Sequence, residues 1–318
     1  MSNVTACILS YNRAEYLSAA IDSILQQTVK PDEILIFDNG SDASVYERIS
    51  PYLDSGVSWI AADINRSAAW NFRRAVATAK SEYVFVLHDD DRLCIDFVEK
   101  QIKFLSQNPD VGAVTCNGYL INEVGRRTGR LLRYDDFLGE VEFYRSAAAV
   151  AILYAGDSCI PFSPVVYRTE FVRAGNLREE FGKVLDAVFF CDLAKLGVLA
   201  YQLSPLYECR VHRAQDSNYF PAVELDRLTD YFECEATGSD VERSELLRKL
   251  VRQHTSRQLI KIYRAVFPVL SMSMLLTELR GLKHRRYSFI SAIVICAEAL
   301  SKRFRIKKFR KLNIEAND

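Results

Sequence analysis

Three consecutive aspartates, Asp89, Asp90 and Asp91, are the residues of this sequence best suited to chemistry. They directly follow Tyr83–Leu87, an uninterrupted apolar run typical of a buried strand. Adjacent carboxylates repel one another, so folding alone does not explain them at this position. A hard divalent cation, Mg²⁺ or Mn²⁺, would neutralise the cluster and could bridge it to phosphate oxygens. The alternative is a solvated acidic turn that caps the helix after it.

Two further polar clusters also follow predicted strands. The sequence Ser10-Tyr11-Asn12-Arg13 comes after Val4–Leu9, and Asp38-Asn39-Gly40-Ser41 comes after Glu33–Phe37. The Asp38 carboxylate can close an Asx turn, or it can accept hydrogen bonds from a ligand at the edge of a nucleotide site.

The elements that must position these clusters alternate between short β-rich runs and amphipathic helical patterns. The N-terminal part predicts strands at Val4–Leu9, Glu33–Phe37, Val57–Ala61 and Tyr83–Leu87, and helices at Glu15–Gln27, Ser44–Leu53 and Ala68–Ala79. The middle adds strands at Ala113–Ile121, Pro164–Tyr167 and Leu199–Leu203, a hairpin-like stretch at Gly125–Arg133, and a helix from about Asp186 to Leu196. Strands separated by helices of this length form a parallel sheet, which binds ligands beyond the carboxyl ends of its strands.

The charge of the chain is distributed unevenly. Its 318 residues are 49% hydrophobic and 26% charged, a composition that excludes disorder and leaves room for one large domain with an appendage. Residues 1–239 carry 23 basic and 34 acidic side chains, whereas residues 240–318 carry 18 and 7. The C-terminal region is helical in pattern from about residue 222, and seven Lys and Arg in residues 302–311 follow the apolar run Tyr287–Leu300.

This basic region suits an anionic membrane surface, where each basic residue contributes about 1 kcal/mol. The alternative is a helical appendage that packs on the main domain or on a second subunit of an oligomer. Nucleic acid is not expected as a partner, because no recognised binding module accompanies the charge. The eight cysteines form no CxxC pair, the N-terminus has no signal-peptide pattern, and no apolar run reaches the ~18 residues of a membrane span. We therefore expect a cytoplasmic protein, peripheral on the inner face of the membrane where the basic region binds lipid.

An ordered set of blocks resembles the family 2 glycosyltransferases, which have the GT-A fold. The blocks are Ser10–Arg13, Ser23–Thr28, Glu33–Ser41, Asn65–Asn71 with Ala75, and the acidic triplet, which resembles the family's Asp-x-Asp metal motif in its form that starts with His. Ser67 replaces the glycine that the family normally has in the fourth block. The resemblance covers roughly residues 3–215. It implies an α/β, Rossmann-like, mixed and mostly parallel sheet flanked by helices over residues 1–221, with a helical, basic extension over residues 222–318.

The resemblance also assigns roles to residues. Nucleotide binding falls to Ser10, Tyr11, Asn12, Arg13, Asp38, Arg66, Asp89 and Asp90. A divalent cation, Mn²⁺ or Mg²⁺, would be ligated by Asp90 or Asp91, with Asp89 as second choice. His212, in a block that resembles the family's Arg-x-His, would complete the metal shell or touch a phosphate. Asp186 occupies the place of the general base, although Leu185 stands where the family has Glu.

The activity implied is metal-dependent, inverting transfer of a sugar from a nucleotide-sugar donor. The donor expected is a UDP-sugar, and the acceptor is a hydroxyl of a glycan or lipid-linked molecule in cell-surface polysaccharide synthesis. A non-catalytic nucleotide-sugar-binding or scaffold subunit is the first alternative, because the Glu before Asp186 is missing. A nucleotidyltransferase is the second, although it would need a glycine-rich phosphate loop that Ser10–Arg13 does not provide.

Overall fold

The computed structural model describes residues 3–133, 140–155, 158–212, 222–237 and 245. Its strands are β1 Val4–Ser10, β2 Glu33–Asp38, β3 Val57–Ile60, β4 Tyr83–His88, β5 Arg92–Leu93, β6 Val111–Ile121, β7 Arg127–Leu131, β8 Val141–Tyr144, β9 Val165–Arg168 and β10 Val198–Arg210. Its α-helices are α1 Ala14–Leu25, α2 Ala43–Ile49, α3 Ala68–Thr78, α4 Phe97–Gln107, α5 Ala147–Ala155, α6 Thr169–Arg173, α7 Leu185–Leu196 and α8 Ala222–Thr237. Two 3₁₀ helices, η1 Ser50–Ser55 and η2 Glu179–Val184, complete the described elements.

The chain divides into two compact units. One comprises residues 1–154 and 158–218, and the other comprises residues 155–157 and 219–318. The strands described above all belong to the first unit and form one mixed sheet in the order β3-β2-β1-β4-β9-β6-β10-β5, with β7 on β6 and β8 on β10.

The register of the sheet brings the polar clusters together. Strands β3, β2, β1 and β4 run parallel, so that Ser10 pairs with Asp38 and Leu9 pairs with His88. Strand β9 is antiparallel to both β4 and β6, which returns β6 and its parallel neighbour β10 to the direction of β4. The carboxyl end of β10, at Arg210, therefore lies at the same edge of the sheet as the end of β4.

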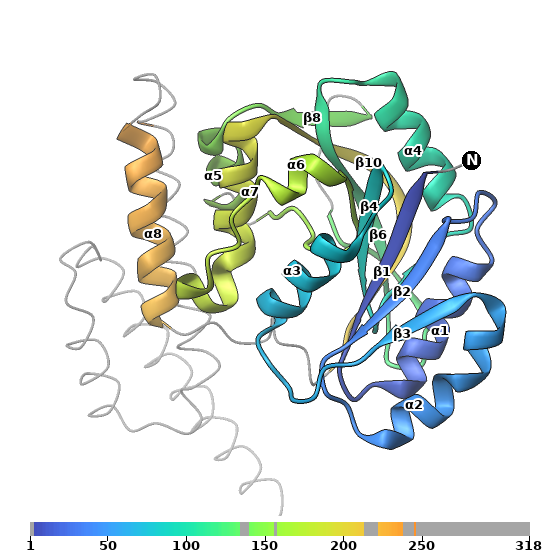
Figure 1. Cartoon of the computed structure of the whole chain (residues 1–318). Helices are drawn as coiled ribbons and strands as arrows, with labels where there is room; N and C mark the ends of the chain where they lie inside the picture. Colours follow the sequence, from blue (N-terminus) through green and yellow to red (C-terminus); the bar gives the residue numbers. More distant parts are fainter. Residues whose placement is uncertain (1–2, 134–139, 156–157, 213–221, 238–244, 246–318) are drawn as a thin grey trace, which may run out of the picture. The chain divides into compact units, whose positions relative to one another are not determined.

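Helices cover both faces of this sheet (Figure 1), with α1, α2 and α4 on one face and α3, α6 and α7 on the other. Helix α1 forms because its apolar residues recur at three- and four-residue spacing, and its Leu17, Ala20, Ile21 and Ile24 are buried. They pack in one core cluster with Ile8 of β1 and Phe85 and Leu87 of β4. This core fixes the strand ends that carry the polar residues.

The predicted architecture, a mixed sheet flanked by helices, is confirmed, and the three longest strand pairings are parallel. Two elements differ in extent. The helix predicted at Ser44–Leu53 ends as an α-helix at Ile49 and continues as a 3₁₀ helix, because Pro51 cannot donate the backbone hydrogen bond that an α-helix needs. Strand β10 is much longer than predicted and contains register shifts around Pro205.

The predicted helical C-terminal region begins with α8, Ala222–Thr237. The apolar run Tyr287–Leu300 and the basic cluster in residues 302–311 lie outside the described residues. Among the helices that are described, none has the length and apolar character needed to cross a membrane.

Candidate functional site

The three aspartates form a turn between β4 and β5. Asp89 turns inward and accepts hydrogen bonds from the backbone N–H of Tyr11, 3.0 Å away, and from Nη1 of Arg13, also 3.0 Å away. The same Nη1 lies 3.4 Å from Oδ2 of Asp90. Asp89, Asp90 and Asp91 are all buried. Arg13 therefore supplies positive charge to two of three carboxylates that have little access to water.

The carboxyl end of β10, from a distant part of the sequence, contacts the same turn. The backbone N–H of Arg210 donates to Oδ1 of Asp91 at 2.9 Å. The Nε2 atom of His212 lies 3.0 Å from Oδ2 of Asp90. The structure thus brings together the predicted metal residues Asp90, Asp91 and His212, although about 120 residues separate them in the chain.

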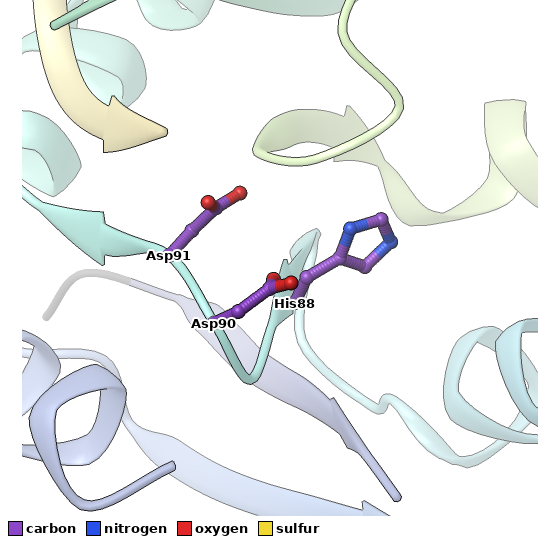
Figure 2. Close-up of side chains that lie close together, drawn as sticks. All are labelled: His88, Asp90 and Asp91. Atoms are coloured by element: carbon purple, nitrogen blue, oxygen red, sulfur yellow. The ribbon is translucent and has the colours of Figure 1, made fainter. Parts of the chain in front are cut away.

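His88, Asp90 and Asp91 form a group that could hold a metal ion. Each offers one ligand atom, and these atoms all lie within 4.8 Å of one another. Figure 2 shows the imidazole of His88 and the two carboxylates projecting to one side of the turn. A set of carboxylate oxygens with one imidazole nitrogen suits Mn²⁺ or Mg²⁺ rather than a thiolate-seeking metal. His88 was not among the predicted ligands.

The ionisation of the triplet also favours a bound cation. Burial raises the pKa of Asp89 to about 6, with Arg13 opposing the shift. Burial and the neighbouring charge of Asp90 raise the pKa of Asp91 well above its ordinary value. Burial works against ionisation of Asp90 too, but His88, His212 and Arg13 together hold its pKa below the ordinary value. Repulsion between these carboxylates opposes their simultaneous ionisation. A divalent cation between them would offset that repulsion.

The ends of β1 and β2 form a second group of polar atoms. The Asp38 Oδ2 atom accepts from the backbone N–H groups of Gly40 and Ser41, at 3.1 and 3.0 Å, so the predicted Asx turn is present. Its Oδ1 atom is buried, as is the Oγ atom of Ser10, and neither has a hydrogen-bond partner in the part of the chain that the structure describes. Buried polar atoms normally have partners, so these two are the best placed to bind a ligand.

Asn12 and Arg66 are engaged within the protein. Asn12 has a left-handed backbone (φ +52°), its N–H donates to Oγ of Ser41, and its side-chain oxygen accepts from the N–H of Asp42. The guanidinium of Arg66 lies 4.5 Å from the centre of the Trp70 ring. A role in nucleotide binding stays a prediction for both residues, with the side-chain oxygen of Asn12 already used to join two loops.

The Asn65–Asn71 block supports the strand ends. Ser67 caps α3 by accepting from the N–H of Trp70 at 3.1 Å, with φ −63°, so this position does not require the family's glycine. The side-chain amide of Asn71 donates to the backbone carbonyl of Phe37 at 2.8 Å. These contacts show how the block holds β2 and α3 together.

Asp186 lies in the first turn of α7 rather than at its N-cap, which is Val184. Its Oδ2 atom is 3.5 Å from the hydroxyl of Tyr154. Burial raises the pKa of Asp186 to about 6, although the backbone N–H groups of Ala187 and Asp186 and the Tyr154 hydroxyl pull it down. A carboxyl group with this pKa is ionised at neutral pH and is a stronger base than an exposed aspartate.

One aromatic ring links the acidic turn to α7. The centre of the Phe162 ring is 6.1 Å from that of His88 and 6.1 Å from those of both Phe189 and Phe190. The neighbouring Ser163 accepts from the backbone N–H of His88 at 2.8 Å. The sequence carries no periodic signal for such a loop contact, and it was not predicted.

Comparison with known proteins agrees with this geometry. Residues 5–173 match the family model described as glycosyl transferase family 2. An uncharacterized glycosyltransferase of Haemophilus influenzae is 22% identical over 285 residues, which are 86% of this chain and 79% of that protein. The Escherichia coli protein WfaP, named as a UDP-Glc:α-D-GlcNAc-diphosphoundecaprenol β-1,3-glucosyltransferase, is 30% identical over 105 residues, or 33% of this chain and 42% of that protein.

An uncharacterized glycosyltransferase of Methanocaldococcus jannaschii is 30% identical over 126 residues, 38% of this chain and 43% of that protein. The chain thus spans less than half of the length of two of these curated relatives. Among solved structures, S. aureus TarS residues 1–349 with UDP-GlcNAc has a TM-score of 0.61 at 14% identity, covering 85% of this chain and 76% of that one. The mannosyltransferase PcManGT of Pyrobaculum calidifontis, solved with GDP-Man and Mn²⁺, has a TM-score of 0.55 at 16% identity, covering 95% of this chain and 87% of that one. At these identities the structures establish a shared fold.

Proposed function

This chain belongs to glycosyltransferase family 2 and has the GT-A fold of an enzyme that transfers sugars, and from that premise we propose that it moves a sugar from a UDP-sugar to a hydroxyl acceptor with inversion at the anomeric carbon. The observation that carries the proposal is the meeting, at one edge of the sheet, of a group that could hold a cation (His88, Asp90 and Asp91) with the buried oxygens of Ser10 and Asp38 that have no hydrogen-bond partner among the described residues. The first group suits a diphosphate, and the second suits the N–H and hydroxyl groups of a nucleoside.

The nucleoside end would lie over β1 and β2. Asp38 can accept from the imide N–H of a uracil ring through Oδ1, because its other oxygen is held in the Asx turn. Ser10 offers a hydroxyl beside it, and Tyr11 is 41% exposed, so its ring is free to lie against the base. Arg66 would close the far side from its place over Trp70. Asn12 would act through its side-chain amide nitrogen, because its N–H and side-chain oxygen bind Ser41 and Asp42. Asp89 would support the ribose side while it orients Arg13.

The diphosphate end would lie at the acidic turn. The residues present fit a divalent cation, which His88, Asp90 and Asp91 would hold with His212 beside Asp90. Such a cation, Mn²⁺ or Mg²⁺, would stabilise the charge that develops on the leaving nucleoside diphosphate. Arg13 adds a positive charge that is already positioned against Asp89 and Asp90.

Asp186 would serve as the base. Its raised pKa matches a group that takes the proton of the acceptor hydroxyl as that hydroxyl attacks the anomeric carbon. The Tyr154 hydroxyl, 3.5 Å from Oδ2, would orient the carboxylate. A single displacement from the side opposite the leaving group inverts the anomeric centre. Leu185 in place of the usual Glu leaves Asp186 as the one acid at this position.

The acceptor we propose is a glycan or lipid-linked sugar of a cell-surface polysaccharide. Support comes from relatives such as WfaP, whose name specifies a diphosphoundecaprenol-linked acceptor, and TuaG of Bacillus subtilis, named as a putative teichuronic acid biosynthesis glycosyltransferase. The basic C-terminal region would hold the enzyme, as a cytoplasmic protein, at the anionic inner face of the membrane where such acceptors reside. We propose that residues 1–221 form the transferase domain and residues 222–318 this contact region.

A thermal-shift panel of UDP-, GDP- and dTDP-sugars, each with and without Mn²⁺, tests the proposal most directly. We expect UDP-sugars to raise the unfolding temperature most, and only with the metal. Donor hydrolysis by the wild type and by Asp186→Asn then separates an enzyme from a non-catalytic binder, because a binder would show the shift without turnover. Proton NMR of the product gives the configuration of the new linkage, and retention would contradict the mechanism. A preference for GDP- or dTDP-sugars would contradict the donor assignment alone.

A further inference from the structure

Arg210 makes more contacts to the acidic turn than any function proposed above explains. Its backbone N–H donates to Oδ1 of Asp91 at 2.9 Å, and its Nε donates to the backbone carbonyl of Asp90 at 2.8 Å. Its side chain is buried, since the residue is only 3% exposed. One residue thus holds two successive positions of the turn, one through a side-chain oxygen and one through the main chain.

The other side of the same guanidinium holds a second loop. Its Nη1 donates to the backbone carbonyls of Asn122 and Glu123, at 3.1 and 3.0 Å. These residues begin the turn between β6 and β7. Because a guanidinium is planar and its N–H groups have fixed directions, three carbonyls bound by it are fixed relative to one another. The β4–β5 turn and the β6–β7 turn are therefore locked at one spacing.

An aromatic ring completes the environment of Arg210. The guanidinium carbon lies 4.4 Å from the centre of the Tyr16 ring, on α1. The same ring is 5.6 Å from the imidazole of His212. A cation over an aromatic face is stabilised, which helps to offset the cost of burying the guanidinium. Tyr16 therefore connects Arg210 to the histidine that touches Asp90.

We infer that Arg210 is a positioning residue: it holds the acidic turn in the one conformation that presents His88, Asp90 and Asp91 to a shared cation. The inference rests on the proposed function for the identity of that cation and adds to it the residue that sets the ligand geometry. The side-chain hydrogen bonds described above go to main-chain carbonyls, and the guanidinium lies over the Tyr16 ring, as suits a residue that holds the turn. Without its side chain the carboxylates would remain, but the main chain at Asp90 would lose its tie to the β6–β7 turn.

Two variants of the full chain test this. Arg210→Ala removes all three carbonyl contacts, whereas Arg210→Lys keeps the charge but lacks the planar fork. The matched control is Arg126→Ala, because Arg126 lies in the turn that Arg210 holds and is exposed. Thermal unfolding of each variant shows whether the fold is kept. Where Arg210→Ala does not fold, Arg210→Lys carries the comparison.

The first measurement needs no metal. Hydrogen–deuterium exchange of the metal-free protein should become faster in the peptides that contain residues 88–93 and 122–125 for Arg210→Ala, less so for Arg210→Lys, and not for Arg126→Ala. The second measurement is Mn²⁺ affinity, from the electron paramagnetic resonance signal of the free ion. We expect roughly tenfold weaker binding for Arg210→Ala, a partial loss for Arg210→Lys and no change for the control, as for other residues that orient metal ligands.

The outcomes of the two measurements separate this inference from the proposed function. Unchanged exchange in residues 88–93 would overturn the inference, whether or not the protein binds Mn²⁺. Faster exchange with wild-type Mn²⁺ affinity would overturn it too, since the turn would then not need to be held for binding. Faster exchange in a protein whose wild type binds no Mn²⁺ would support Arg210 as the residue that holds the turn, and it would contradict the metal dependence of the proposed function instead.

Discussion

The Asp186→Asn variant should be more stable than the wild type and nearly inactive. Burial raises the pKa of Asp186 from 3.8 to about 6, a difference of about 2 pKa units. Each unit corresponds to about 1.4 kcal/mol, and Asp186 is only partly buried, so its ionised form lowers the free energy of unfolding by at most about 3 kcal/mol at pH 7.5. Asparagine has a similar shape, and its side-chain oxygen can still accept from the Tyr154 hydroxyl.

The sign of the pH dependence follows from the direction of the shift. The folded protein binds the Asp186 proton more tightly than the unfolded chain, so stability from this group is fully present below pH ~4 and is lost as the pH rises through ~6. The gain from Asp186→Asn should therefore be at most about 3 kcal/mol at pH 7.5, about half of that at pH 5 and small below pH 4. Urea unfolding at these pH values measures it.

The control is Asp192→Asn on the same helix. Asp192 forms ion pairs with Lys195 at 3.1 Å and with Arg178 at 3.9 Å, so its loss should cost up to about 1 kcal/mol and never stabilise. Transfer activity should fall by roughly 10²- to 10⁴-fold in Asp186→Asn, the usual contribution of a general base. An Asp186→Asn variant whose stability relative to the wild type is the same at pH 5 and pH 7.5 would refute the reasoning, because the carboxylate would then carry no burial cost.

Three further predictions concern the sheet edge. Asp90→Asn should abolish the Mn²⁺-dependent thermal shift by UDP, and EDTA should reduce wild-type turnover until Mn²⁺ is added back; turnover that persists in EDTA would contradict a metal role. Asp38→Asn should weaken UDP binding by roughly ten- to a hundredfold in calorimetry, because a charged acceptor is lost, and equal affinities would remove Asp38 from the base site. Gly40→Ala should lower the free energy of unfolding by about 2 kcal/mol or more, because φ is +78° and a Cβ would lie 2.6 Å from the backbone carbon of Ile64. The matched control is Gly56→Ala, which has φ +83° and open space around it. That substitution should lower the free energy of unfolding by about 1 kcal/mol.

Much of the fold was predictable because its signals are local. The apolar runs before Ser10, Asp38 and His88 define three strands, and parallel pairing then places their ends at one edge. Helix α1 follows from the spacing of its apolar residues. The short β5 and the small helix α6 could not be found in this way, because two to five residues carry no periodicity.

The contacts between distant loops were beyond what the sequence could predict. The turn of Asp89–Asp91 was evident, but its partner on β10 depends on an antiparallel strand, β9, inserted between β4 and β6. His212 was found through the Arg-x-His block, which begins at Arg210, but the block did not indicate that the Arg210 side chain is buried against the acidic turn. His88 directly precedes the triplet, and its distance to Asp90 and Asp91 becomes visible only once the turn is formed.

The position of Phe162 would affect how substitutions change the substrate of such an enzyme. This side chain lies next to His88 on one side and to α7, which carries Asp186, on the other. Under the proposed function it would act as a spacer between the departing diphosphate and the incoming hydroxyl. A smaller residue at position 162 would make room for a bulkier donor, but it would also fix the diphosphate and the acceptor hydroxyl less firmly relative to each other. The same substitution would therefore widen the range of donors and slow turnover.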